Sequence, residues 1–277
     1  MRRMYQYILY IPLLLGTGCG GDRQAIPDKE GIIPPAGYSL VWHDEFDAPE
    51  RLPDAADWWF ENGNYGWGNH ELQNYVPGFY ERDTTALVCD GSLKIIARKH
   101  GDEVISTRMN TKESWLYGYF EARLKLPKGK GTWPAFWMLS QPFENWPDDG
   151  EIDIMEEVGY RPNWVSATIH SKAYYHSTGT QKSQEKFVAT AQDDFHTYAV
   201  EWTPDLIRAY LDGEVYFEFA NDKTGNKDTW PFNRPFYLKL NLAWGGDWGG
   251  AQGVDESSLP AVYEIDYVRV FQKNDAR

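Results

Sequence analysis

Three carboxylates within a short segment have the types and spacing for acid/base chemistry. Residues 150–159, Gly-Glu-Ile-Asp-Ile-Met-Glu-Glu-Val-Gly, alternate polar and apolar side chains with the period of a β-strand, so Glu151 and Asp153 share one face. Strict alternation would send Glu156 into the core, where an unpaired carboxylate is costly. One inserted residue near Met155, a β-bulge, would return Glu156 to the face of the other two acids.

Two carboxyl groups about 5 Å apart suit the retaining hydrolysis of a glycosidic bond, in which one attacks the sugar and the other donates and then removes a proton. We assign Glu151 as nucleophile, Glu156 as general acid/base, and Asp153 as a helper that shares a proton with a neighbour. Two alternatives stay open. The acids could form a solvated face of an edge strand, with Glu157 facing water. They could also bind Ca or Mg, although they lack the Gly and Asn spacing of a loop site.

Composition favours a sugar ligand over nucleic acid. The 277 residues include 13 Trp, 18 Tyr and 13 Phe, more rings than a core alone would use, so we expect many on a surface that binds flat apolar faces. Sugars and bases both have such faces. The net charge of −14 would repel nucleic acid, which needs a basic footprint. The length allows one large β domain or two small domains.

The first residues have the features of an export signal. Arg2 and Arg3 precede an apolar run over residues 8–15, and small residues then lead to Cys19. The run is too short to span a bilayer as a permanent helix. Small residues just before a cysteine resemble the bacterial lipoprotein signal, which implies that residues 1–18 are a signal peptide and that Cys19 is lipidated. We therefore expect an exported protein that is anchored to a bacterial membrane at the cell surface. Because Gly16 stands where Leu or Val is usual, secretion or a periplasmic location is the alternative.

The segment after Cys19 is expected to connect the anchor to a folded domain. Residues 19–37 are rich in Gly, Pro and charge, as in a surface tether, so the domain should span residues 38–273. Removing residues 1–18 takes away two Arg and no acid, which changes the formal charge from −14 to −16. If Cys19 carries lipid, Cys89 has no disulfide partner, and we expect it to be a small buried hydrophobe.

Short strands separated by turns, with no long helix, predict an all-β sandwich. Residues 117–126 alternate between core side chains such as Phe120 and outward ones such as Glu121, and Asp212-Gly213 favours a tight hairpin. Two curved antiparallel sheets would leave an open groove, which suits a long polysaccharide better than a pocket does. The expected strands are residues 93–98, 117–126, 132–139, 165–170, 200–202, 206–211, 215–219, 235–242 and 261–271.

Aromatic residues just before the acids are candidates for stacking on sugars. If Phe136 and Met138 fill the core, alternation turns Trp133, Ala135 and Trp137 toward the groove. Indole rings there would stack on sugar faces. Plain packing of either Trp in the core is the alternative.

Two loops and one histidine are further candidates. Residues 66–73 carry an aromatic ring with amide and imidazole donors, which suit hydroxyl recognition. Residues 244–250 are glycine-rich without the Lys or Ser/Thr of a phosphate loop, so we expect a flexible groove wall. His170 could hydrogen-bond near the acids, although a lone His on a strand is more often structural.

Four motifs together carry a family resemblance. They are residues 151–156, Glu-Ile-Asp-Ile-Met-Glu; residues 133–139, Trp-Pro-Ala-Phe-Trp-Met-Leu; residues 67–73, Trp-Gly-Asn-His-Glu-Leu-Gln; and residues 266–270, Asp-Tyr-Val-Arg-Val. From about residue 38 to residue 273, the chain resembles glycoside hydrolase family 16, in particular its laminarinase-like branch. The resemblance implies a β-jelly-roll and a retaining endo-hydrolase of β-1,3-glucan, mixed-linkage β-1,3/1,4-glucan or both. It implies the same roles for Glu151, Asp153 and Glu156.

The resemblance also implies further site residues. It places Asn69, Arg108, Trp115, Trp133 and Trp137 against the substrate. On the grounds given above, we add His170 and Trp244 to these candidates. It implies a structural Ca held by Asp266, Glu45 and the backbone of Gly91, although an ordinary hydrogen-bonded acid is an equal alternative at both carboxylates. The chemistry itself needs no cofactor.

Other functions stay open beside this one. His70 stands where Asn is frequent in the branch, and Trp244 and Gly249 also depart from its pattern, which leaves the exact glucan undecided. Agarases and carrageenases of the same family share the acid motif, whereas the loop over residues 67–73 favours glucan over galactan. A non-catalytic β-glucan-binding surface protein and a lectin-like sandwich that binds Ca are alternatives from other classes. We expect a monomer whose partner is β-glucan and not nucleic acid.

Overall fold

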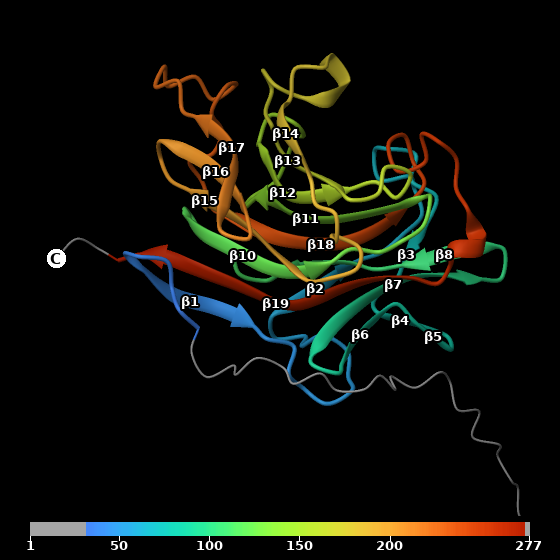
Figure 1. The fold of residues 1–277 in the computed structure, drawn as a ribbon. Coiled ribbons are helices and arrows are strands. Elements are labelled where there is room, and N and C mark those ends of the chain that lie inside the picture. Colours follow the sequence, from blue (N-terminus) through green and yellow to red (C-terminus); the bar gives the residue numbers. More distant parts are fainter. Residues whose placement is uncertain (1–31, 275–277) are drawn as a thin grey trace, which may run out of the picture.

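The computed structural model describes residues 32–274, which form two stacked β-sheets (Figure 1). The expected signal peptide, Cys19 and most of the tether lie outside the described residues. The all-β prediction is confirmed, since helical turns in the described chain are limited to 3-10 turns at His176–Thr178 (η1) and Glu256–Ser258 (η2). No helix among the described residues is long and apolar enough to cross a membrane.

The larger sheet has ten strands, and its neighbours pair antiparallel except for one parallel pair, β3 with β8. In spatial order they are β17 (Glu214–Ala220), β16 (Leu206–Leu211), β15 (His196–Trp202), β10 (Gly118–Lys125), β19 (Ala261–Lys273), β7 (Ser92–His100), β8 (Glu103–Ser106) and β3 (Asn74–Tyr75). Off this path, β1 (Tyr38–Asp44) pairs with β19 and β6 (Ala86–Cys89) pairs with β7.

The second sheet has seven strands, all antiparallel, and it carries the acid motif near its middle. Its order is β14 (Lys182–Phe187), β13 (Trp164–His170), β12 (Glu151–Glu157), β11 (Thr132–Ser140), β18 (Phe236–Trp244), β9 (Arg108–Thr111) and β2 (Trp58–Glu61). A separate hairpin pairs β4 (Phe79–Tyr80) with β5 (Asp83–Thr84).

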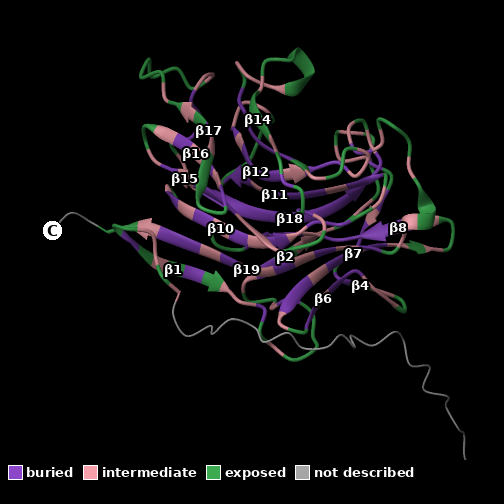
Figure 2. Ribbon diagram, in the orientation of Figure 1, coloured by how far each residue is buried: buried purple, intermediate pink, exposed green. Residues whose placement is uncertain are grey.

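Alternating side chains fill the space between the sheets. On β10, Phe120, Ala122 and Leu124 are buried as predicted, and burial of such apolar surface is the main favourable contribution to folding. Figure 2 shows buried residues along the central strands of both layers and exposed ones in the loops above and below. Cys89 is buried and free, as expected for a small hydrophobe.

Turn residues fix how neighbouring strands connect. Asp212 and Gly213 both have positive φ, 49° and 80°, in the two-residue connection between β16 and β17. Two positive φ values are the requirement of a type I′ turn, whose twist matches that of the flanking strands. Asp90 and Gly91 make the equivalent connection between β6 and β7, with φ of 52° and 74°. The predicted hairpin at Asp212-Gly213 is therefore confirmed.

Candidate active site

A β-bulge in β12 places the acids on one face, as predicted. On β11, Trp137 pairs with Asp153 and Phe136 with Met155, so Ile154 has no partner of its own. The pairing with β13 shifts over the same stretch, between Asp153 and Glu156. Ile154 and Met155 are both fully buried in the core, and the extra residue therefore turns Glu156 back to the face of the other acids.

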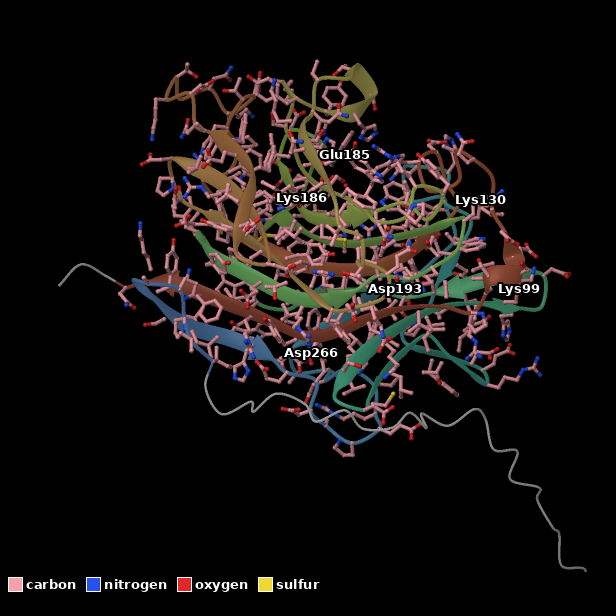
Figure 3. The ribbon with its side chains drawn as sticks, viewed as in Figure 1. Lys99, Lys130, Glu185, Lys186, Asp193 and Asp266 are labelled. Atoms are coloured by element: carbon pink, nitrogen blue, oxygen red, sulfur yellow. The ribbon has the colours of Figure 1, made fainter. Side chains whose placement is uncertain are left out.

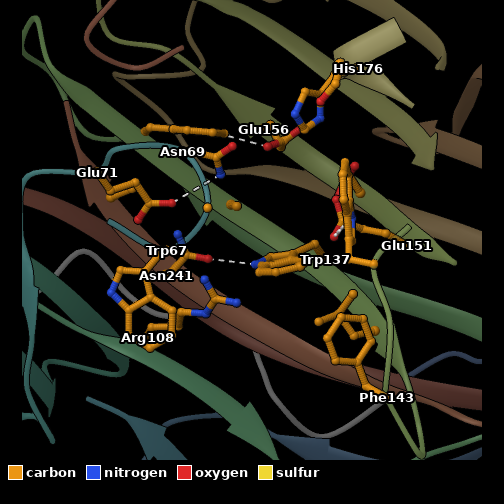
Figure 4. Close-up of a pocket in the computed structure, with 18 residues that line it drawn as sticks. Trp67, Asn69, Glu71, Arg108, Trp137, Phe143, Glu151, Glu156, His176 and Asn241 are labelled. Carbon is orange, nitrogen blue, oxygen red and sulfur yellow. Dashed lines mark hydrogen bonds between the residues drawn. The ribbon is translucent and has the colours of Figure 1, made fainter. Parts of the chain in front are cut away.

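That face is the wall of a cavity of about 370 Å³ (Figure 4). The side chains of Arg108 and Trp67 lie on one side of it, and those of Glu151 and His176 lie on the other. Aromatic rings, carboxyl groups and amides make up most of the lining, as is usual where a ligand with both apolar faces and hydroxyl groups binds. The lining residues are Trp67, Gly68, Asn69, Glu71, Arg108, Trp133, Ala135, Trp137, Leu139, Phe143, Trp146, Glu151, Asp153, Glu156, His176, Ser177, Asn241 and Ala243.

Two indole groups hold the two glutamates. Trp133 Nε1 donates to Glu156 Oε1 at 3.0 Å, and Trp146 Nε1 donates to Glu151 Oε2 at 3.1 Å. A hydrogen bond to a carboxylate favours its ionised form and fixes its orientation. Trp137 has a different partner, because its Nε1 donates to Asn241 Oδ1 at 2.7 Å.

Burial raises the pKa of all three acids, and repulsion by a neighbouring carboxylate adds to the rise for Glu151 and Glu156. For Glu151 and Glu156, burial is the largest cause and the charge of Asp153 the next, and each pKa rises to about 8. Burial raises the pKa of Asp153 well above its ordinary value. At neutral pH these three coupled carboxyls therefore do not all carry a negative charge. Such a group can provide a protonated acid and an ionised nucleophile at the same time.

His170 lies against the acids rather than in the cavity lining. It is 6% exposed, and its Nε2 is 3.4 Å from Asp153 Oδ2 and 3.8 Å from Glu151 Oε1. Its ring also lies 5.8 Å from that of Trp146 and 5.5 Å from that of His176, measured between centroids. His170 thus supports the acids and the rings beside them, and the structure does not place it among the residues that line the cavity.

One set of potential metal ligands coincides with the acids. Within the described residues, one group of three His, Cys, Asp or Glu side chains is close enough together to hold a cation. It consists of Glu151, Asp153 and His170, whose ligand atoms lie within 4.8 Å of one another. Glu156 completes the cavity wall without belonging to this set. The acid/base interpretation uses all three carboxyls, whereas a metal site would use two of them.

A buried charge cluster holds the far wall of the cavity. The Arg108 guanidinium lies 4.7 Å from the Trp67 ring centroid and 4.8 Å from that of Trp137, and it is paired with Glu61. Lys239, fully buried on the neighbouring strand, donates to Glu61 Oε2 at 3.1 Å. Burial lowers the Lys239 pKa to about 7. The predicted contact residues Arg108 and Trp137 are therefore fixed in place by charges beneath them.

Trp115 and Trp244 do not line the cavity, which corrects the expectation that they contact substrate. Trp115 is 7% exposed and packs in the core, 5.6 Å from Trp42 between ring centroids. Trp244 is 1% exposed and also belongs to the core. A buried ring cannot stack on a sugar, so neither side chain serves this role.

The loop over residues 244–250 is more strongly held than a flexible groove wall would be. Asp247 N donates to the Asn69 carbonyl at 2.7 Å, and the Asp247 carboxylate lies 2.9 Å from His70 Nδ1. Trp248 in this loop meets the Trp133 ring edge-on at 5.4 Å. The two loops singled out in the sequence therefore support each other beside Asn69, which lines the cavity.

Glu157 does not face water, and β12 is not an edge strand, so the solvated-face alternative is wrong. β12 lies between β11 and β13. Glu157 is fully buried, and its Oε1 accepts hydrogen bonds from Asn163 N at 2.5 Å and Gln192 Nε2 at 3.1 Å. Burial raises its pKa to about 7.

The two carboxylates expected to bind Ca are paired with guanidinium groups instead. Glu45 accepts from Arg269 with both oxygens, each at 2.8 Å, and Asp266 Oδ2 accepts from Arg123 at 2.8 Å. Calcium takes six to eight oxygen ligands, and these oxygens would have to leave their arginines first. As arranged, Glu45, Asp266 and the Gly91 turn do not fit a calcium site, and whether the chain binds calcium stays a prediction.

Several lining residues had no part in the sequence-based site. Asn241 had a usable signal, because it is a polar residue at the groove-facing parity of β18, where Leu240 and Leu242 face the core. Trp146 lies in a loop and His176 in the 3-10 turn η1, and no periodicity relates either segment to a cavity. The other lining residues of this kind include Phe143 and Ser177.

Comparison with known proteins agrees with the fold. The model of glycosyl hydrolases family 16 matches residues 78–269. A beta-glucanase of Rhodothermus marinus is 48% identical over 248 residues, which cover 85% of each chain. The X-ray structure of the laminarinase from Rhodothermus marinus superposes with a TM-score of 0.81 at 47% identity, covering 86% of this chain and 98% of the other. SCLam, a non-specific endo-beta-1,3(4)-glucanase, superposes with a TM-score of 0.82 at 44% identity, covering 88% and 95%. On this evidence, together with the bulged acid motif on a β-jelly-roll, the chain belongs to glycosyl hydrolases family 16.

Proposed function

We propose that the protein is a retaining endo-hydrolase of β-1,3-glucan, mixed-linkage β-1,3/1,4-glucan or both. The observation that carries this proposal is the bulge at Ile154, which puts Glu151, Asp153 and Glu156 on the wall of one aromatic cavity. Two similar proteins, a laminarinase and an endo-beta-1,3(4)-glucanase, support β-glucan as the substrate. The open groove suits attack within a chain rather than at its end.

In the first step, Glu156 donates its proton to the glycosidic oxygen as the bond from that oxygen to the anomeric carbon breaks. The ionised Glu151 carboxylate attacks the same carbon and forms a glycosyl-enzyme ester. Trp146 holds Oε2 of Glu151, which leaves Oε1 for the attack. Asp153, whose pKa burial raises well above its ordinary value, keeps a proton near Glu151 and limits the repulsion between the acids.

In the second step, Glu156 removes a proton from water, and the water oxygen attacks the anomeric carbon while Glu151 leaves. Two inversions at one carbon restore the β configuration. The indole of Trp133 assists this step, because its hydrogen bond to Glu156 Oε1 stabilises the ionised form of Glu156 that the first step produces. The rings of Trp133 and Trp137 would position the sugar by stacking.

The test is incubation with laminarin, barley β-glucan and agarose, followed by product sizing and by NMR of the first anomer released. We expect oligosaccharides of mixed length from one or both glucans, with β configuration, and none from agarose. Release of the α anomer would overturn the role assignment. Binding of glucan without cleavage would instead identify a capture protein.

We also propose that the protein is exported, anchored through a lipidated Cys19 to a bacterial membrane, and monomeric. The support is the sequence of residues 1–19, with a basic start, an apolar run and small residues before the cysteine. Cys19→Ala should move the expressed protein from the membrane fraction to the soluble exported fraction. Retention of the variant in the membrane fraction would refute the anchor, and size-exclusion chromatography with light scattering tests the monomer.

A further inference from the structure

Two exposed aromatic side chains stand next to each other beyond the acids. Trp164 on β13 is 38% exposed and Phe187 on β14 is 54% exposed. They are directly opposite in the strand register, with ring centroids 5.5 Å apart. Single exposed apolar residues are ordinary on protein surfaces, whereas a cross-strand pair of large rings forms a continuous apolar surface.

The register puts this pair on the groove side of the sheet. On β13, Val165, Ala167 and Ile169 belong to the core, so residues 164, 166, 168 and 170 point to the opposite face. Ser166 pairs with Glu156 on that face, and Trp164 is the next residue along it. The pair therefore lies on the same face as the general acid/base, outside the cavity itself.

The strand order determines what lies on this side of the acids. The cavity extends from β12 across β11, β18 and β9, which contribute Trp137, Asn241 and Arg108. On the other side of β12, β13 and β14 complete the sheet. A polymer that crosses the strands at the acids and stays on this face continues over these two strands, and β14 lies about 10 Å from β12.

The surroundings of the pair hold the tryptophan in place. The Arg161 guanidinium lies 4.4 Å from the Trp164 ring centroid and is paired with Glu185 Oε1 at 2.5 Å. Glu185 faces the same side as Phe187, because it pairs with Ser166, and Figure 3 shows it in the half of the molecule that lies across the sandwich from Asp266. Rings flanked by charged hydrogen-bonding groups suit a ligand with apolar faces and hydroxyl edges.

The edge strand itself argues against a protein occupant. β14 has the sequence Lys-Ser-Gln-Glu-Lys-Phe, with a lysine at each of two positions and a glutamate between them. Charges on an edge strand oppose pairing with another strand. A neutral polysaccharide forms no backbone ladder and is not opposed in this way.

We infer that Trp164 and Phe187 form an auxiliary binding platform for the β-glucan chain where it leaves the groove past Glu156. The inference rests on the proposed function and deepens it, since it assigns a second contact region to the same substrate. The platform increases affinity for long chains that span both regions, as linked binding sites do. Short substrates that end within the cavity do not reach it.

Binding is measured by affinity electrophoresis in laminarin gels, with Glu151→Gln in every variant so that the polymer stays intact. Adding Trp164→Ala and Phe187→Ala should lower the affinity about fivefold, and Trp164→Tyr should retain most of it because a ring remains. Phe79→Ala, which removes an aromatic residue that is 49% exposed on β4, is the matched control and should bind as the parent does. If the double variant does not fold, the laminarin affinity of the single variant Phe187→Ala is compared with that of the parent instead.

Kinetics with the catalytic acids intact give a second measurement. The ratio of kcat/KM on laminarin to kcat/KM on a short aryl laminaribioside should fall about fivefold in the double variant. Unchanged laminarin affinity, or an equal loss on both substrates, would overturn the platform. Failure of the unmutated enzyme to release sugars from any glucan would overturn the proposed function, whereas the binding assay would still decide whether the platform exists.

Discussion

Replacing Trp133 by Phe should shift the alkaline limb of the pH–rate profile to higher pH. The Trp133 indole donates to Glu156 Oε1 at 3.0 Å, and this bond lowers the Glu156 pKa against burial, which raises it to about 8. Phe keeps a ring but removes the donor, so the ionised form loses support and the pKa rises. A hydrogen bond to a charged group contributes about 1.5 to 3 kcal/mol, and one pKa unit corresponds to 1.36 kcal/mol. Because water from the groove replaces part of the lost bond, we expect a shift of about one unit.

The assay is kcat/KM on laminarin from pH 5 to pH 10, which reports the acid of the free enzyme. The proton on Glu156 is needed for the first step, so a higher pKa extends activity to higher pH. Trp137→Phe is the matched control, because it also removes an indole N–H but one that donates to Asn241, and its alkaline limb should stay in place. A limb that stays or moves to lower pH in Trp133→Phe would refute the assignment of Glu156 as the acid.

Four further predictions follow from the site and the core. Glu151→Gln and Glu156→Gln should each lower kcat on laminarin by about 10³ or more, with unchanged circular dichroism; a loss below tenfold would contradict their roles. With azide, Glu156→Ala should give a β-glycosyl azide and Glu151→Ala an α-glycosyl azide by NMR, and the opposite result would exchange the two residues. Burial raises the Glu157 pKa to about 7, so the folded chain keeps this proton longer than the unfolded chain and stability falls as pH rises from about 4 to about 7. When the free energy of unfolding is measured in urea at pH 4 and pH 7, Glu157→Gln should lose up to about 3 kcal/mol less than the unmutated protein. An equal loss of stability in both proteins would contradict this. Because Glu45 and Asp266 are paired with arginines, a chelator should leave Tm and activity unchanged, and a calcium-dependent rise in Tm would show that the pairs yield to the ion.

Alternation was a reliable guide wherever apolar side chains mark one face. All nine expected strands lie within or overlap observed ones, and both the bulge and the groove-facing side of β11 follow from the same rule. β9 and β14 were missed because Arg-Met-Asn-Thr and Lys-Ser-Gln-Glu-Lys-Phe show no such face. Their conformation comes from pairing with neighbours that are distant in sequence, which local patterns do not contain.

The wrong predictions that Trp115 and Trp244 contact substrate have a different cause. Indole rings suit both a groove and a core, so residue type alone does not decide between them. For Trp244 the decision was available, because it shares the parity of Leu240 and Leu242 on β18 and therefore points into the core. The expected strand stopped at Leu242, and the remaining residues were assigned to a loop. Trp146 had no comparable signal, since its loop reaches Glu151 only through the folded path of residues 141–150.

Glu156 and Glu157 show that position relative to the bulge, rather than residue type, decides which carboxyl takes part in chemistry. Burial raises both pKa values, to about 8 and about 7, so acidity alone would make either a candidate general acid. Glu156 lines the cavity with Glu151, whereas Glu157 is fully buried and receives its hydrogen bonds from Asn163 and Gln192. Without the extra residue at Ile154 the two would exchange faces, because a one-residue slip moves each side chain of a strand to the other side. In the proposed mechanism, the inserted residue thus selects Glu156 rather than Glu157 as the general acid, and the buried partners of Glu157 stabilise the register on which this selection depends.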